Sequence, residues 1–238
     1  MTLTLGSPAS RRVVLFAAGA GGDPRRYRPL LNILADHGYC VIAPEFARID
    51  AATATTQDLL IRPHGLIEAL DAAVKPNTEI AFIGHSIGGW AGLCLAGATP
   101  READGTIIDV PRDPRLNRLV LYAPAVGWFW HSDALDGMTL PTRIYVGAKD
   151  TITPPTQAQL LTTARGDAID VRVIDHVGHF TFMHHRPPGV VEDDSALDLT
   201  QFFDDLAEST LHFLQTDPTK NDGTVGHTLT PSDPERTP

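Results

Sequence analysis

A short apolar run that ends in a glycine-rich turn constrains this chain more than any other feature. Residues 80–83 read Ile-Ala-Phe-Ile, as expected for a strand buried on both faces. Residues 84–88, Gly-His-Ser-Ile-Gly, then fit the pattern G-x-S-x-G, and the Gly-, Ala- and Leu-rich segment 87–98 predicts a buried helix. Ser86 would therefore stand on a tight strand-to-helix turn, with the helix N-terminus favouring a developing negative charge. The alternative is a glycine-rich turn with an idle serine.

The overall composition excludes several classes of protein. The chain has 238 residues, an apolar fraction of 42% and a net charge of −10, without a basic cluster. It can therefore form one domain with a full core, and its charge argues against nucleic acids and anionic membranes as partners. Cys40 and Cys94 are its only cysteines and have no C-x-x-C pattern, so we expect small buried residues, not a disulfide or metal site. Without a signal-peptide pattern or a bilayer-spanning stretch, the sequence predicts a cytoplasmic protein.

Apolar strands alternate with helices along the chain. We expect strands at residues 12–17, 39–43, 80–83, 118–123, 142–147 and 169–174. We expect helices at residues 24–36, 63–74, 87–98, 154–164 and 199–214. This alternation predicts an α/β fold with a mostly parallel central sheet and helices on both faces. One domain would span residues 1–216, and the segment 217–238, which offers almost nothing to bury, is expected to be a disordered tail.

Three polar residues follow three of the predicted strands. Ser86 follows 80–83, Asp150 follows 142–147, and His179 follows 169–174. In a parallel sheet these positions share the carboxyl edge, where ligands bind, and the order Ser, Asp, His is that of a nucleophile–base–acid triad on such a sheet. The histidine would take the serine proton and return it to the leaving group, while the aspartate fixes the ring and stabilises the imidazolium.

Other residues compete for the roles of base and acid. His179 is preferred as base because Gly178 and the strand end place it on a loop that reaches back over the sheet. His176 lies closer to the strand, and His85 is expected to pack beside the elbow. His184 and His185 belong to an irregular acidic insertion at 183–198. Asp150 alone could cap a helix or a turn, and Asp175 is the next candidate for the acid.

A glycine-rich loop at residues 18–22 follows the first predicted strand and would complete an oxyanion hole. One donor would be the backbone N–H of Ile87, directly after the nucleophile. The second is assigned to Ala20, with Gly19 as its rival. Phosphate binding is the alternative function of this loop, but it lacks a complete G-x-G-x-x-G and a G-K-[ST] pattern.

The aromatic residues near the predicted site are candidates for a substrate pocket. Gly19, Trp128, Phe129 and Phe180 are assigned to it, and Trp130 and Phe182 are further candidates. The alternative is that several of these rings pack in the core or between loops. The connector between Ala123 and Pro141 is too short for a large cap domain, so the site is expected to be fairly open.

Residues 84–89, Gly-His-Ser-Ile-Gly-Gly, together with 147–150, Gly-Ala-Lys-Asp, and 178–180, Gly-His-Phe, resemble the motifs of the α/β-hydrolase superfamily. The resemblance covers about residues 12–214 and implies the α/β-hydrolase fold. Within the superfamily the chain is most similar to predicted dienelactone hydrolases and to platelet-activating-factor-acetylhydrolase-like serine esterases. Two features depart from these patterns. Ala18 stands where many relatives have the histidine of His-Gly-x-Gly-Gly, and true dienelactone hydrolases use a cysteine where this chain has Ser86.

The triad and the resemblance together imply a serine hydrolase that cleaves small or short-chain carboxylic esters through an acyl-enzyme. The expected partner is a small-molecule ester, and neither a metal nor an organic cofactor is implied. Alternatives with the same triad are a thioesterase, a peptidase, and a C–C hydrolase or lyase, since pocket shape decides among them. A non-catalytic binding protein on this fold is a further alternative, which an intact triad argues against.

Overall fold

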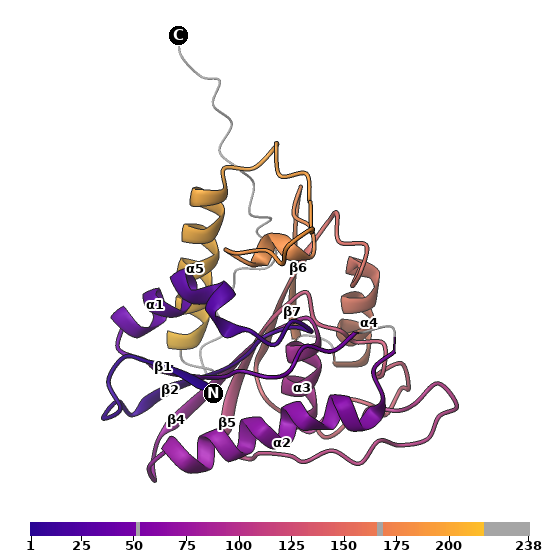
Figure 1. Cartoon of the computed structure of the whole chain (residues 1–238). Helices are drawn as coiled ribbons and strands as arrows, with labels where there is room; N and C mark the ends of the chain where they lie inside the picture. The colour runs from indigo at the N-terminus through magenta and orange to yellow at the C-terminus, as the bar shows by residue number, and fades with distance from the viewer. Residues whose placement is uncertain (51–52, 166–168, 217–238) are drawn as a thin grey trace.

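The centre of the computed structural model is a seven-stranded sheet in the order β1-β3-β2-β4-β5-β6-β7 (Figure 1). The structure describes residues 1–50, 53–165 and 169–216, so the predicted tail 217–238 lies outside the described residues. β1 is antiparallel to β3, and the other strands pair in parallel. The strands are β1 (Thr2–Leu5), β2 (Arg12–Ala17), β3 (Cys40–Pro44), β4 (Glu79–His85), β5 (Leu116–Tyr122), β6 (Thr142–Gly147) and β7 (Ile169–Ile174).

Helices cover both faces of the sheet, as predicted. One apolar cluster joins one sheet face to α2 (Thr56–Ala73), α3 (Ile87–Leu95) and α4 (Pro155–Arg165). A second cluster joins the other face to α1 (Arg28–Asp36) and α5 (Leu199–Gln215), which lie side by side in Figure 1. Short 3-10 helices, η1 (Pro24–Tyr27) and η3 (Phe180–Phe182), precede α1 and follow β7. Strands with both faces covered explain the apolar runs that identify them in the sequence.

The helix α2 begins at Thr56, seven residues before the predicted start at Pro63. Thr55 caps it: its side chain accepts from the Asp58 N–H, and the Asp58 carboxylate accepts from the Thr55 N–H, which forms a capping box. Pro63 lies inside the helix and is buried. Proline is most common in the first turn of a helix, but its missing N–H is tolerated here further along the helix.

The N-terminal strand β1 is a half-buried edge strand, and its residues alternate between exposed and partly buried. Leu3 and Leu5 supply the inward side and pack against the second apolar cluster. Two inward residues give only a weak alternation, which is why the sequence of residues 1–11 carries little pattern.

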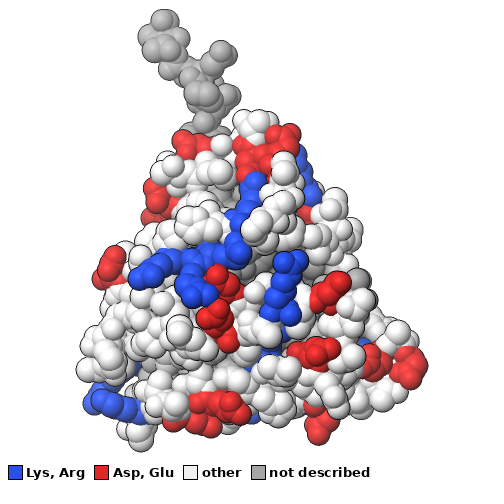
Figure 2. All heavy atoms as spheres, in the orientation of Figure 1, with Lys and Arg blue, Asp and Glu red and all other residues white. Residues whose placement is uncertain are grey.

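Charges of both signs are interspersed on the face shown in Figure 2, so the net negative charge is not gathered into one patch there. Within the described ranges, no helix has the length and apolar character required to cross a membrane.

Candidate active site

Ser86 occupies a strained backbone conformation between β4 and α3. Its φ is 54° and its ψ is −122°, in the left-handed half of the φ/ψ map that non-glycine residues rarely adopt. The Ser86 N–H donates to the Tyr122 carbonyl at 3.0 Å, and the Ser86 carbonyl accepts from Ala125 N–H at 3.0 Å. Gly88 permits the tight turn, because a Cβ there would lie 2.2 Å from the Ala17 carbonyl oxygen. The neighbouring strands β2 and β5 thus hold the serine in place.

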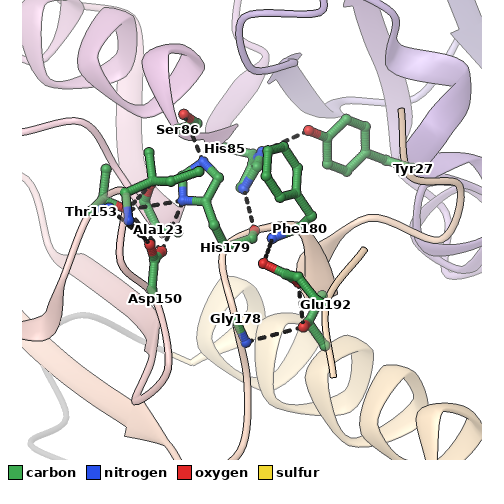
Figure 3. Close-up of polar contacts among 12 residues, drawn as sticks. Tyr27, His85, Ser86, Ala123, Asp150, Thr153, Gly178, His179, Phe180 and Glu192 are labelled. Carbon is green, nitrogen blue, oxygen red and sulfur yellow. Dashed lines mark hydrogen bonds and ion pairs between the residues drawn. The ribbon is translucent and has the colours of Figure 1, made fainter. Parts of the chain in front are cut away.

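The structure brings Ser86, His179 and Asp150 into one hydrogen-bonded chain, drawn in Figure 3. Ser86 Oγ lies 3.0 Å from His179 Nε2, and His179 Nδ1 lies 2.8 Å from Asp150 Oδ2. The three residues follow β4, β7 and β6, whose carboxyl ends share one edge of the sheet. His179 is 4% exposed and Asp150 is 3% exposed, so this contact is shielded from water. Such an arrangement can transfer a proton from the serine to the histidine.

Asp150 is held by several donors besides His179. Its Oδ1 accepts from the backbone N–H groups of Ile152 and Thr153, each at 2.8 Å. The Thr153 hydroxyl lies 2.9 Å from Asp150 Oδ2 and 3.1 Å from the Ala123 carbonyl oxygen. Burial acts to raise the pKa of Asp150, but the hydrogen bonds from His179 and Thr153 outweigh it, so its pKa lies below the ordinary value. Asp150 is therefore an ionised carboxylate beside the histidine ring.

His85 packs beside the elbow, as predicted, and forms a second polar chain. Its Nε2 lies 3.0 Å from the His179 carbonyl oxygen, and its Nδ1 lies 2.7 Å from the Tyr27 hydroxyl. A carbonyl only accepts, so His85 carries its proton on Nε2 and accepts from Tyr27 on Nδ1. Burial, helped by the neighbouring His179, lowers the pKa of His85 to about 3. The His85 ring is therefore neutral, and it holds the backbone carbonyl of His179.

The acidic insertion at 183–198 folds back onto the loop that carries His179. Glu192 Oε1 accepts from the Phe180 N–H at 2.9 Å, and Glu192 Oε2 accepts from the Thr181 hydroxyl at 2.9 Å (Figure 3). Asp194 Oδ1 lies 3.0 Å from the same Thr181 hydroxyl oxygen, and Asp194 forms an ion pair with Arg186. These contacts of Glu192 are not among those predicted from the sequence. The only available signal was an acidic run shortly after the Gly-His-Phe segment.

The competing residues lie elsewhere. Asp175 and His176 are exposed in the turn after β7. His184 stacks on Phe203 with ring centroids 3.6 Å apart, and His185 is exposed. None of these four side chains has a described hydrogen bond to Ser86 or Asp150, whereas His179 contacts both.

The loop at 18–22 lies against the nucleophile. A Cβ on Gly19 would lie 3.3 Å from Ser86 Cβ and 3.2 Å from His85 Nδ1, so only glycine fits this approach without a shift of its neighbours. The Ala20 carbonyl accepts from the Ile49 N–H at 2.9 Å, which fixes this part of the loop. The assignment of the Ala20 and Ile87 N–H groups as oxyanion donors stays a prediction.

The predicted pocket residues fall into three different environments. Phe129 is 4% exposed and belongs to the core cluster with α2 and α3. Trp128 is half-buried, with its ring edge-on to Trp90 at 6.0 Å. Phe180 borders the triad, with its ring 5.1 Å from that of His179. Phe182 is fully buried, and Trp130 is 53% exposed.

One hollow of about 330 Å³ lies beside His179, the one triad residue in its lining. Its walls come from the turn after β6 and from the returning insertion, and they include His179, Phe180, Ile152, Val190 and Val191. Phe180 is the predicted pocket residue that lines it; Trp128 and Phe129 do not. A larger hollow of about 560 Å³ lies along the outer side of α2 and includes no triad residue, so we relate the smaller one to function. The described residues contain no group of three His, Cys, Asp or Glu side chains arranged to bind a metal ion.

Comparison with family models gives a partial match. The Chlorophyllase family model matches residues 5–103, which include the 18–22 loop and Ser86 but end before Asp150 and His179. No curated protein matches the sequence.

Solved hydrolase structures match nearly the whole chain. Esterase 2 of the Planctomycetes species Thermogutta terrifontis, with butyrate bound, is 18% identical with a TM-score of 0.60, covering 92% of this chain and 91% of that one. The monoacylglycerol lipase of Paleococcus ferrophilus is 14% identical with a TM-score of 0.59, covering 90% and 97%. A predicted CIB-like hydrolase from Thermoplasma acidophilum is 15% identical with a TM-score of 0.55, covering 87% and 91%. At these identities the likeness concerns the fold.

Proposed function

Because the chain has the α/β-hydrolase fold, we propose that it is a serine hydrolase of carboxylic esters. The observation that carries this proposal is the hydrogen-bonded chain from Ser86 Oγ through His179 to the ionised Asp150, set on a strained turn. A buried histidine between a hydroxyl and a carboxylate is the arrangement that activates a serine nucleophile. The narrower resemblance to dienelactone hydrolases and platelet-activating-factor acetylhydrolases stays a prediction.

Acylation begins when Ser86 Oγ attacks the ester carbonyl carbon. His179 Nε2 takes the serine proton, and the imidazolium that forms is stabilised by Asp150 through Nδ1. The carbonyl oxygen becomes an oxyanion, which the Ile87 and Ala20 N–H groups bind in the proposed oxyanion hole. Collapse of this tetrahedral intermediate breaks the ester C–O bond, and His179 returns the proton to the departing alcohol.

Deacylation repeats these steps with water in place of the serine. His179 takes a proton from the water, whose oxygen attacks the acyl carbon bound to Ser86. The second tetrahedral intermediate releases the carboxylic acid and restores the Ser86 hydroxyl. Every transferred proton passes through His179 Nε2, so the reaction requires only the ester and water.

The hollow beside His179 supports a small substrate. Its volume of about 330 Å³ is at the lower end of the range for small-molecule sites, and its lining combines the apolar Ile152, Phe180 and Val190 with the charged Lys149, Glu192 and Asp193. The esterase from Thermogutta terrifontis has been captured with butyrate bound. We therefore assign the substrate to small esters with short acyl chains. Cys40 and Cys94 are both free and buried, which fits the proposed cytoplasmic location.

Hydrolysis of p-nitrophenyl acetate, butyrate and octanoate by the wild type and by Ser86→Ala tests this proposal. We expect wild-type turnover that falls from butyrate to octanoate and is lost in the variant. Labelling by a fluorophosphonate should likewise require Ser86. Labelling that survives Ser86→Ala would identify another nucleophile, and a folded wild type that cleaves thioesters or amides but no ester would overturn the substrate class.

A further inference from the structure

A buried arginine on α2 lies directly behind the 18–22 loop. Arg62 is 1% exposed, and its Nη2 donates to the carbonyl oxygens of Gly19 at 3.3 Å and Ala20 at 3.4 Å. Both hydrogen bonds are long, and the same carbonyls also accept from the Gly22 and Ile49 N–H groups at 2.9 Å. The buried Arg62 Nε has no hydrogen-bond partner among the described residues. Across the described residues, no carboxylate forms an ion pair with Arg62, and the Phe46 ring lies 5.5 Å from the guanidinium carbon.

An unpaired charge in this position is costly to the fold. Buried cations are usually matched by a carboxylate, and a charge without one carries the full penalty of leaving water. Burial lowers the pKa of Arg62 to about 10, so the guanidinium is still protonated at neutral pH. The contact with Phe46 and the two long hydrogen bonds offset only part of that penalty. Arg62 is thus a positive charge on α2 that no carboxylate of the described residues neutralises by an ion pair.

The carbonyl groups that Arg62 contacts belong to the proposed oxyanion loop. The Gly19 C=O and the Ala20 N–H are the two ends of one peptide group, so a cation at the oxygen makes the N–H a stronger donor. The same loop approaches the nucleophile, since a Cβ on Gly19 would lie 3.3 Å from Ser86 Cβ. In a dry interior the field of the guanidinium is weakly screened at this range.

We propose that Arg62 is a positioning residue for the oxyanion hole, which holds the Gly19–Ala20 peptide and supplies positive charge behind it. This inference rests on the proposed function. The missing counter-charge is the oxyanion itself, which exists only in the tetrahedral intermediates. Arg62 would then act mainly on reactions at Ser86 that place negative charge in the hole, and little on ground-state binding of an ester.

The test compares Arg62→Met with the wild type in two reactions at Ser86. Met removes the charge and keeps an apolar chain in the buried site, and thermal unfolding verifies that the variant is folded. We expect the rate constant for fluorophosphonate inactivation and kcat for p-nitrophenyl butyrate to fall by about a hundredfold, the size of one lost oxyanion contact. KM should change by less than about threefold, because the ground state gains little from the charge. Arg48→Met, at an exposed position in the loop between β3 and α2, is the matched control and should leave both rates unchanged.

Arg62→Lys provides a second readout that a structural role would not move. A buried lysine loses its proton more readily than arginine, so its charge should disappear between about pH 7 and 10. We expect this variant to react with the fluorophosphonate at near wild-type rate at pH 7 and progressively more slowly, relative to wild type, as the pH rises. If Arg62→Met fails to fold, the pH dependence of Arg62→Lys tests the role of Arg62 on its own.

The outcomes separate this inference from the proposed function. A wild type that neither cleaves esters nor reacts with a fluorophosphonate at Ser86 overturns both. A wild type that does both, with Arg62→Met equally reactive or with Arg62→Lys parallel to the wild type at every pH, overturns the role of Arg62 alone. A rise in KM at constant kcat would also overturn it, since that result assigns Arg62 to ground-state binding.

Discussion

The two sides of Ser86 are held in different ways. On the histidine side, Asp150 accepts hydrogen bonds of 2.8–2.9 Å, and the peptide group that follows His179 is bonded at both its C=O and its N–H. On the oxyanion side, the Gly19 and Ala20 carbonyls accept backbone hydrogen bonds of 2.9 Å from Gly22 and Ile49. Arg62 adds contacts of 3.3 and 3.4 Å to these carbonyls, while its Nε has no partner among the described residues. The first side must keep one geometry through both half-reactions. The oxyanion side must respond to a negative charge that forms and disappears in each half-reaction. The Arg62 guanidinium on that side still has an N–H donor that no described group uses.

The largest effect is expected from Asp150→Asn, which removes the carboxylate that contacts His179 Nδ1. The amide cannot stabilise the imidazolium and favours the wrong ring tautomer, and the same change in the triad of a serine protease lowers kcat by about 10⁴-fold. We expect a loss of that order in p-nitrophenyl butyrate turnover with the fold intact by circular dichroism. Near-normal turnover would assign the acid elsewhere, and the exposed Asp175 would be tested next.

A smaller loss is expected from Glu192→Gln, which tests whether the returning insertion orders the His179 loop. The amide replaces one acceptor by a donor facing a Phe180 N–H or Thr181 hydroxyl, so the loop should shift. We expect kcat to fall by about tenfold, since misplaced catalytic groups cost up to about a hundredfold. Glu208→Gln, the same change at an exposed position on α5 outside the hollow beside His179, serves as the control. Equal kcat values for the two variants would show that Glu192 does not position the loop.

Tyr27→Phe tests the second polar chain on the same side. It leaves His85 Nδ1 buried and unpaired, which should cost about 1–3 kcal/mol of unfolding free energy in urea denaturation, with a fewfold loss in kcat. Tyr145→Phe is the matched control, because its hydroxyl pairs with Ser209 at 2.7 Å on α5. The control should lose stability without losing kcat. A kcat loss of the same size in both variants would contradict the proposed positioning role.

The smallest effect concerns pH. Because the folded-state pKa of His85 is about 3 and the unfolded value is about 6.5, the unfolded chain binds a proton between these values that the folded chain does not. Stability should therefore decrease as pH falls below 6.5, by at most about 1.4 kcal/mol per pH unit from this group. Urea denaturation at pH 7, 6 and 5 should show a shallower decrease for His85→Gln. Identical slopes would mean that His85 is not buried in its neutral form.

The sequence predicts the sheet and the placement of the triad residues for a physical reason. β6 and β7 have the predicted bounds, and Asp150 and His179 closely follow them. β6 is buried along its whole length, whereas the edge strand β7 is identified by apolar residues that alternate with Asp170 and Arg172. Residues that act over long sequence distances have no such local signature. Tyr27, Arg62 and Glu192 reach their partners only after the chain has folded, and Phe129 packs in the core although it stands in a row of aromatic residues.

The way in which His179 is anchored has a consequence for the speed of the reaction. Its own carbonyl is bonded to His85, and the N–H of the next residue is bonded to Glu192, while only the ring contacts Ser86 and Asp150. During acylation the His179 ring exchanges a proton with two oxygen atoms, first that of Ser86 and then that of the leaving alcohol. With the main chain fixed, this displacement reduces to small librations about the side-chain torsions, which take picoseconds to nanoseconds. Proton delivery would then not wait for a segmental rearrangement of the loop that carries His179.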